Sequence, residues 1–203
     1  MRTQVRASIR RVLGVYFERP AAAALAWAGV SPDAVTVVGL LVAFAAAGLV
    51  AAGYLLAGGL VLLGSGAFDM LDGALARSTG KAGPFGALLD STVDRVSEAA
   101  ILFGVSVYFI LEDSPLIVVL AFLAVTGSFM VSYVRARAEA LDVDCEVGVM
   151  TRTERVIALS AALVAAQWIP LVLTVVLGAI ATLGIATACY RVVYAHRRLS
   201  ERG

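Results

Sequence analysis

The chain has 203 residues, of which 61% are hydrophobic and 15% are charged, and its mean hydropathy is +0.92. A soluble domain is closer to half apolar, so this composition argues against an ordinary soluble protein and predicts an integral membrane protein. The net charge of +1 gives no reason to expect a nucleic-acid partner. The two cysteines, Cys145 and Cys189, indicate neither a disulfide framework nor a zinc site.

The first 20 residues predict an amphipathic helix that lies on the membrane surface, and they do not resemble a signal peptide. Arginines recur from Arg2 to Arg11 with apolar residues between them, at the spacing of a helix with one basic face. A helix of this kind binds an anionic membrane surface through its basic face. We therefore expect a juxtamembrane helix over residues 1–20.

Six apolar segments follow, and each is interpreted as a membrane-spanning helix, since about 20 apolar residues cross a bilayer. They are Ala34–Ala52, Leu56–Ala76, Gly86–Leu111, Leu116–Ala138, Glu154–Trp168 and Leu171–Tyr194. Ser31 or Asp33 can cap the first of them. The expected fold is an all-α integral membrane protein with a single domain over residues 1–203, in which a six-helix bundle over 34–194 follows the surface helix.

The basic residues are segregated along this predicted topology. All 16 of them fall within residues 2–19, 77–95, 135–155 and 191–202, which would lie at one side of the membrane. The positive-inside rule places that side in the cytoplasm. We expect a multi-pass protein of the plasma membrane with both termini, and any active site near these residues, at the cytoplasmic face.

The segment "FDMLDGALARSTGKAGPFGALLDSTVDRVSE", residues 68–98, places carboxylates in apolar surroundings. Asp69 and Asp72 are three residues apart, and Asp90 and Asp94 are four apart, so each pair shares one face of a helix. Glycines and Pro84 between the pairs favour a turn. The sequence therefore predicts a helical hairpin in which four carboxylates face one another.

Four converging carboxylates repel unless cations neutralise them, and ionisable groups within membrane segments usually mark function. Oxygen ligands suit Mg²⁺ or Mn²⁺, and two such ions can clamp a phosphoryl group. Zinc is not expected, because the only histidine is His196. The alternative is a structural ion-pair network with Arg77, Lys81 and Arg95, although apolar residues often replace buried ion pairs without loss of stability.

This segment also resembles the signature of the CDP-alcohol phosphotransferases, D-x2-D-G-x2-A-R-x8-G-x3-D-x3-D. Every fixed position is present: Asp69, Asp72, Gly73, Ala76, Arg77, Gly86, Asp90 and Asp94. The resemblance implies a transferase that moves a phosphatidyl group from a CDP-diacylglycerol-type lipid, diacyl or archaeal, to an acceptor hydroxyl and releases CMP. It further implies two Mg²⁺ (or Mn²⁺) ions as cofactors and a homodimer.

The resemblance also implies a role for individual residues. The four aspartates of the signature would bind metal, and Asp94 would in addition act as the general base. The CDP-lipid site would comprise Asp33, Thr36, Asp72, Gly73, Ala76, Arg77, Gly83 and Gly86. Glycine lets a bulky ligand approach a helix backbone, and arginine presents a planar fork of donors to phosphate. For Asp33 and Thr36, capping of the first span is an equally good explanation.

The acceptor is indicated by "SFMVSYVRARAEA" (128–140) and "MTRTERVI" (150–157). These stretches resemble the phosphatidylinositol phosphate synthases within the family, which implies inositol phosphate as the acceptor. Its phosphate would be bound by Ser132, Arg135, Arg152, Arg155 and Arg191. The alternative is that cytoplasmic helix ends collect arginine in any membrane protein. Glu98 is expected to be a packing group or a group that supports a residue of the site, and not a catalyst.

Two other functions remain open at this point. A phosphatidylglycerophosphate synthase would use glycerol 3-phosphate in place of inositol phosphate. A cation or lipid transporter would need a polar route across the whole membrane, whereas the carboxylates gather towards one face and the outer halves of the spans are apolar.

Overall fold

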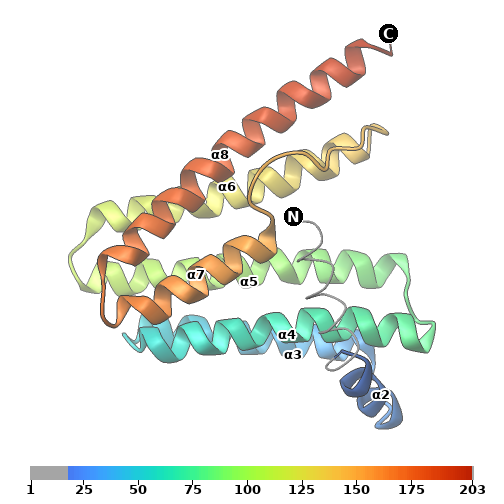
Figure 1. Cartoon of the computed structure of the whole chain (residues 1–203), viewed down its shortest axis with the longest axis horizontal. Helices are drawn as coiled ribbons and strands as arrows, with labels where there is room; N and C mark the ends of the chain where they lie inside the picture. Colours follow the sequence, from blue (N-terminus) through green and yellow to red (C-terminus); the bar gives the residue numbers. More distant parts are fainter. Residues whose placement is uncertain (1–17, 203) are drawn as a thin grey trace, which may run out of the picture. The chain divides into compact units, whose positions relative to one another are not determined.

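The computed structural model describes residues 18–202, which fold into helices and contain no strand. The surface helix expected over residues 1–20 lies almost wholly outside the described residues. The described helices are α2 (Arg19–Trp27), α3 (Pro32–Ala51), α4 (Leu55–Thr79), α5 (Pro84–Leu111), α6 (Pro115–Glu139), α7 (Arg152–Ala166) and α8 (Leu171–Ser200) (Figure 1).

Helices α3 to α8 coincide with the six apolar segments of the sequence. Four of them, α3, α4, α6 and α8, are long and apolar enough to cross a membrane. Charged residues occupy the first half of α5. With 15 residues, α7 is only about 22 Å long, less than the roughly 30 Å of a bilayer core. The all-helical fold is thus confirmed and the chain has the helices of an integral membrane protein, while six spans stay a prediction.

The contacts divide the chain into two compact units, each of which is described separately. The first unit contains the described residues up to 43, together with residues 64–97. Its small core consists of Ala22 of α2, Val35 of α3 and Leu75 of α4. This packing fixes the end of α4 against the beginning of α3, and these ends carry much of the acidic motif.

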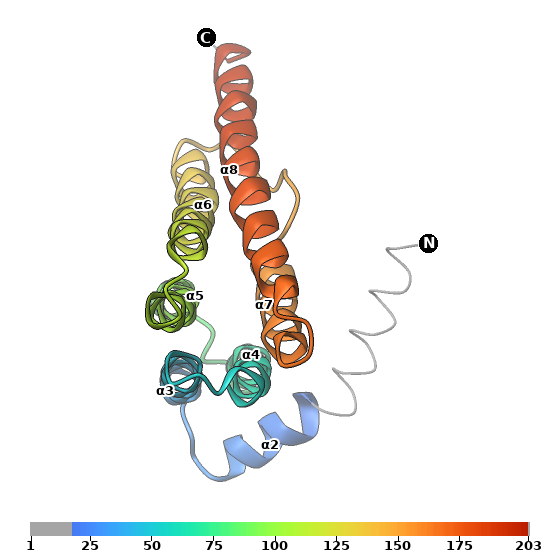
Figure 2. The same cartoon turned by 90° about the vertical axis from the view of Figure 1, so that its left-hand side faces the viewer.

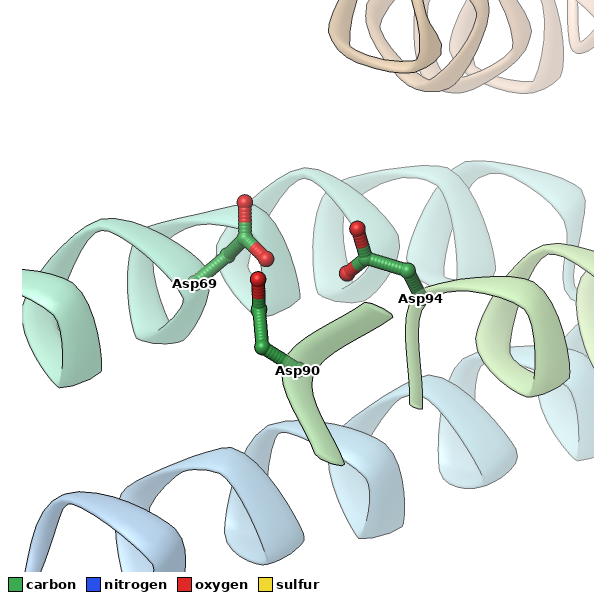
Figure 3. Close-up of side chains that lie close together, drawn as sticks. All are labelled: Asp69, Asp90 and Asp94. Atoms are coloured by element: carbon green, nitrogen blue, oxygen red, sulfur yellow. The ribbon is translucent and has the colours of Figure 1, made fainter. Parts of the chain in front are cut away.

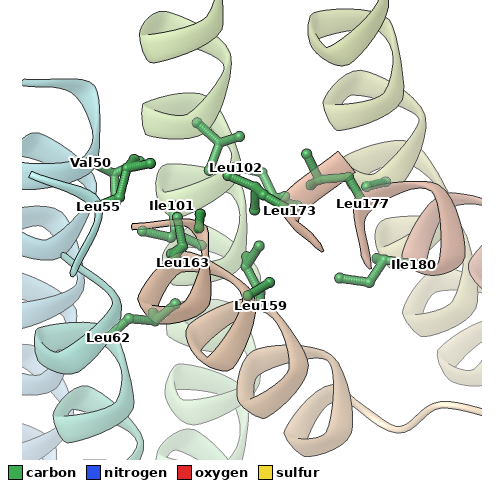
Figure 4. Packing of buried hydrophobic residues seen from close by; sticks show 14 of the residues in the cluster. Val50, Leu55, Leu62, Ile101, Leu102, Leu159, Leu163, Leu173, Leu177 and Ile180 are labelled. Carbon is green, nitrogen blue, oxygen red and sulfur yellow. The ribbon is translucent and has the colours of Figure 1, made fainter. Parts of the chain in front are cut away.

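The second unit contains residues 44–63 and 98–202, and it holds the larger core. Leucine, isoleucine and valine side chains of five helices meet there, including Val50, Leu55, Leu62, Ile101, Leu102, Leu159, Leu163, Leu173, Leu177 and Ile180 (Figure 4). Figure 2 shows α6 and α8 of this unit side by side. Gly127 and Gly184 let the two backbones approach closely, because a Cβ on Gly184 would lie 3.2 Å from the Gly127 carbonyl carbon.

The connection between α6 and α7, residues 140–151, packs as a small satellite of the second unit. Cys145 is fully buried there with Ala138 and Val143. Burial raises the pKa of the Cys145 thiol, so the thiol stays uncharged near neutral pH. Gly148 has a φ of +114°, and a Cβ on it would lie 2.3 Å from Thr187 Cγ2, so only glycine fits.

A substitution tests the close approach of α3 and α5 in the second unit. A Cβ on Gly104 would lie 2.4 Å from the carbonyl oxygen of Ala47, so Gly104→Ala should force the helices apart. Overpacking of this kind costs about 1–3 kcal/mol, and we expect the melting temperature in detergent to fall by several degrees. Gly178→Ala is the control, since Gly178 is also helical and has nothing within 4 Å of the added Cβ. Equal melting temperatures for the two variants would contradict the close approach.

Candidate active site

The turn between α4 and α5 is built by local backbone chemistry. Helix α4 ends at Thr79, and Gly80 then adopts a left-handed φ of +66°. The N–H group of Lys81 donates a hydrogen bond to the carbonyl oxygen of Ala76 at 3.0 Å, which satisfies the end of the helix as in a Schellman motif. Pro84 then starts α5. The predicted hairpin is confirmed, and it joins the last turns of α4 to the first turns of α5.

Three carboxylates converge across this hairpin. Asp69 of α4 and Asp90 and Asp94 of α5 each offer an oxygen, and these three atoms lie within 4.8 Å of one another. Figure 3 shows the three side chains pointing towards each other. The donors are all carboxylate oxygens and partly buried, which is the donor set that Mg²⁺ and Mn²⁺ prefer. The residues therefore fit a divalent cation, which would also relieve the repulsion between them.

Asp72 does not belong to this group of three. Its side chain is buried, and its Oδ2 accepts a hydrogen bond from Thr36 Oγ1 at 2.6 Å. Its Oδ1 accepts a hydrogen bond from the Gly73 N–H at 2.6 Å. The Thr36 bond connects α3 to α4 and holds the orientation of the Asp72 carboxylate.

Beside the carboxylates lies a cavity of about 300 Å³. It brings together all eight residues that sequence analysis placed in the CDP-lipid site: Asp33, Thr36, Asp72, Gly73, Ala76, Arg77, Gly83 and Gly86. Asp69 and Asp90 also line it, so the cavity is continuous with the carboxylate cluster. Sequence analysis missed Lys81 as a lining residue, although its position in the turn after Arg77 was a usable signal.

The cavity walls show what the glycine and the cap residues do. A Cβ on Gly73 would lie 3.1 Å from Arg77 Nη1, so the glycine makes room for the guanidinium against α4. Arg77 is largely exposed, and its Nη2 lies 4.0 Å from Glu18 Oε2. The α3 cap is Ser31, whose Oγ accepts a hydrogen bond from the Ala34 N–H at 3.2 Å. Asp33 therefore need not cap the helix.

The residues predicted to bind the acceptor phosphate belong to the second unit. Arg135 donates to Glu139 through Nε and to Glu146 through Nη2, both at 2.6 Å. Arg191 donates to two backbone carbonyl oxygens, at 2.8 Å to Val147 and at 2.7 Å to Val131.

The other members of this set differ in exposure. Arg152 and Ser132 are partly buried. Arg155 is almost fully buried and forms an ion pair with Glu98. Three of the five residues, Arg135, Arg155 and Arg191, thus donate hydrogen bonds to acceptors within the protein, and Arg155 is the most deeply buried of them.

The chain is similar to known proteins over most of its length. The model of the family "CDP-alcohol phosphatidyltransferase" matches residues 29–195. The chain is 37% identical to the archaetidylinositol phosphate synthase of Methanothermobacter thermautotrophicus over 200 residues, which are 98% of this chain and 96% of the relative. It is 40% identical to the phosphatidylinositol phosphate synthase of Mycobacterium tuberculosis over 141 residues, 68% of this chain and 64% of that protein.

Solved structures give the same result. The chain matches the crystal structure of the M. tuberculosis phosphatidylinositol phosphate synthase with CDP-DAG bound, with a TM-score of 0.82 and 33% identity over 88% of this chain and 93% of the other. The structure of the same enzyme in complex with manganese and citrate matches with a TM-score of 0.82 and 33% identity, over 87% of each chain. The resemblance inferred from the sequence signature is confirmed.

Removal of one carboxylate tests the cation site. We expect Asp90→Asn to weaken Mn²⁺ binding at least tenfold, or about 1.4 kcal/mol, because it removes one of three converging charges. Isothermal titration of purified protein in detergent, without substrate, measures the dissociation constant. Asp113→Asn is the control, since Asp113 is an exposed residue outside the cluster. Unchanged Mn²⁺ affinity in Asp90→Asn would rule out this site.

Proposed function

The chain belongs to the CDP-alcohol phosphatidyltransferase family, and on that premise we propose that it makes a phosphatidylinositol phosphate-type lipid. It would transfer the phosphatidyl-type group of a CDP-linked lipid to a hydroxyl group of inositol phosphate and release CMP. The single observation that carries the reaction class is the cavity in which converging carboxylates meet Arg77 and a glycine-lined helix surface. The names of the relatives support inositol phosphate as the acceptor.

The proposed donor site is the cavity of the first unit. The four signature aspartates would hold two divalent ions, which when bound supply Lewis-acid stabilisation of phosphoryl charge. Arg77 would donate hydrogen bonds to the diphosphate, where its planar fork matches two oxygens. Gly73 and Ala76 leave the helix surface open to the cytidine nucleotide. Capture of the diphosphate between these groups would orient the lipid-side phosphorus for attack.

The proposed transfer is a displacement at that phosphorus. Asp94 would accept the proton of the acceptor hydroxyl as the hydroxyl oxygen forms a bond to phosphorus. The bond from the same phosphorus to the oxygen that bridges it to CMP breaks, and CMP leaves with the electron pair. Positioning and charge stabilisation account for most of the rate enhancement in phosphoryl transfer, so few reactive side chains are required.

The proposed acceptor site draws on the arginines of the second unit. Some residues of the site would contact the acceptor phosphate directly, and others would hold the contacting residues in place. Together they are Ser132, Arg135, Arg152, Arg155 and Arg191. Arg135 would contact the phosphate directly. Its guanidinium already binds two carboxylates, and one of them belongs to the exposed Glu146. An acceptor phosphate could replace that carboxylate with similar hydrogen bonds.

The arrangement in the membrane is also part of the proposal. Six spans with both termini in the cytoplasm, in the plasma membrane, agree with the segregated arginines and with the positive-inside rule. The site would then open at the cytoplasmic interface, where a soluble sugar phosphate and a membrane lipid can both reach it. We also propose that the protein forms a homodimer, as the family resemblance implies.

An acceptor panel tests the function. Purified protein with CDP-diacylglycerol and Mg²⁺ or Mn²⁺ should release CMP when inositol phosphate is added, and EDTA should abolish the release. Glycerol 3-phosphate should give little or none, and CDP-archaeol in place of CDP-diacylglycerol tells which lipid is preferred. CMP release with glycerol 3-phosphate alone would identify a phosphatidylglycerophosphate synthase, and no release with any acceptor would refute the proposed transfer.

A second assay separates the two roles given to Asp94. Asp94→Asn should lower kcat about 10²- to 10⁴-fold, the contribution typical of a general base. The rate is measured at increasing Mn²⁺ until it no longer rises. If saturating Mn²⁺ restores the wild-type rate, Asp94 is a metal ligand and not the base. Glu112→Gln, in the exposed loop after α5, is the control and should keep the full rate.

A further inference from the structure

A buried ion pair connects α5 to α7 in the second unit. Arg155 donates through Nε to Glu98 Oε1 at 2.6 Å and through Nη2 to Glu98 Oε2 at 2.8 Å. Their side chains are only 3% and 8% exposed. Apolar side chains surround the pair: Leu62, Ile101, Leu102, Val156, Leu159 and Ile180. This two-pronged geometry fixes the plane of the guanidinium as well as its position.

Fold stability alone is a poor reason for such a pair. Removing two charges from water is costly, and well-packed apolar residues can often replace a buried ion pair with no loss of stability. A buried pair does, however, fix geometry more tightly than apolar packing does, because its hydrogen bonds are directional. The role of the pair therefore depends on which part of the chain it holds in place.

The pair holds the connection that leads into α7. A third donor of Arg155, Nη1, reaches the carbonyl oxygen of Met150 at 3.2 Å. Met150 has a φ of +73°, a left-handed conformation that is rare for a residue with a long side chain. Surrounding contacts must hold such a residue in place, because the conformation itself is unfavourable. Arg155 supplies one of those contacts from inside the protein.

Neighbouring carbonyl groups of the same segment are held in the same way from α8. Val147 accepts a hydrogen bond from Arg191 Nε at 2.8 Å, and Val149 accepts one from Thr187 Oγ1 at 3.0 Å. The carbonyl oxygens of Val147, Val149 and Met150 thus accept hydrogen bonds from side chains and not from the backbone of a regular helix or sheet. The path of this segment depends on the side chains that hold it.

Arg152 begins α7 directly after this segment. It lies two residues after Met150 and three before Arg155. The hydrogen bond from Arg155 to the Met150 carbonyl therefore joins the backbone before Arg152 to the helix turn after it. We infer that Glu98 and Arg155 are positioning residues that hold Arg152 for the phosphate of the acceptor. Arg155 would not contact that phosphate itself, because it is buried and three of its donor atoms are already engaged. This inference rests on the proposed function.

Glu98→Gln distinguishes positioning by Arg155 from direct binding. The variant keeps the size of the side chain and removes its charge, so the guanidinium is held less firmly. We expect the KM for inositol phosphate to rise about tenfold, while the KM for CDP-diacylglycerol stays within twofold. If Arg155 bound the phosphate directly, loss of its partner would free its charge. The acceptor KM would then fall or stay unchanged, and either result would overturn the inference.

Two further variants keep the kinetic test interpretable. Glu201→Gln is the matched control, because Glu201 also pairs with an arginine, Arg198 at 3.6 Å, but on an exposed surface. It should leave both KM values unchanged. Should Glu98→Gln aggregate in detergent, Glu98→Asp takes its place, since it keeps the buried charge and shortens the reach by one methylene. The same criterion applies to it: a raised acceptor KM alone supports positioning.

Hydrogen exchange gives a readout that needs no activity. In substrate-free Glu98→Gln, amides in residues 148–151 should exchange at least tenfold faster than in the wild type, with α8 unchanged. Equal exchange in this segment would overturn the inference even in an active enzyme. Absence of CMP release from the wild type would instead refute the proposed function and, with it, the acceptor role of Arg152. The two failures are therefore distinguishable.

Discussion

Like charges brought together in apolar surroundings set the central constraint on this protein. Asp69, Asp90 and Asp94 converge within a chain that is otherwise built for lipid, and their mutual repulsion must be offset by cations. The hairpin turn at Gly80 and the buried contacts of α2, α3 and α4 hold the helices against this repulsion. The same repulsion that destabilises the hairpin without cations favours the binding of divalent ions, which can in turn bind phosphates.

The two units handle polar groups in different ways. In the first unit, carboxylates and an exposed arginine face an open cavity, where a ligand can complete their interactions. In the second, arginines turn inward and satisfy carboxylates or backbone carbonyls, as Arg155 and Arg191 do. An inward arginine orders the chain around it, and in the proposed acceptor site it would leave ligand binding to neighbours such as Arg152. Charge alone therefore does not tell whether an arginine binds a ligand or holds one that does.

Much of the first unit was accessible from sequence, because its interactions are local. Spacings of three and four residues predicted shared helix faces, and the glycines of the turn predicted the hairpin. The hydrogen bond from Thr36 to Asp72 and the pair of Arg155 with Glu98 join residues 36 and 57 positions apart, and no spacing rule reveals them. The predicted helix ends lie close to the observed ones. The number of membrane spans does not follow from composition, because α5 carries charges and α7 is short.

Helix α8 has more length than a membrane needs. Its 30 residues extend about 45 Å, roughly 15 Å more than a hydrocarbon core. Just after α8 ends, Arg202 donates hydrogen bonds to the carbonyl oxygens of Leu141 and Asp142, just beyond α6. Where a bilayer is thinner or thicker, helices commonly adjust by tilting. Here the hydrogen bonds of Arg202 connect the ends of α6 and α8, so the two helices would have to tilt together and not independently.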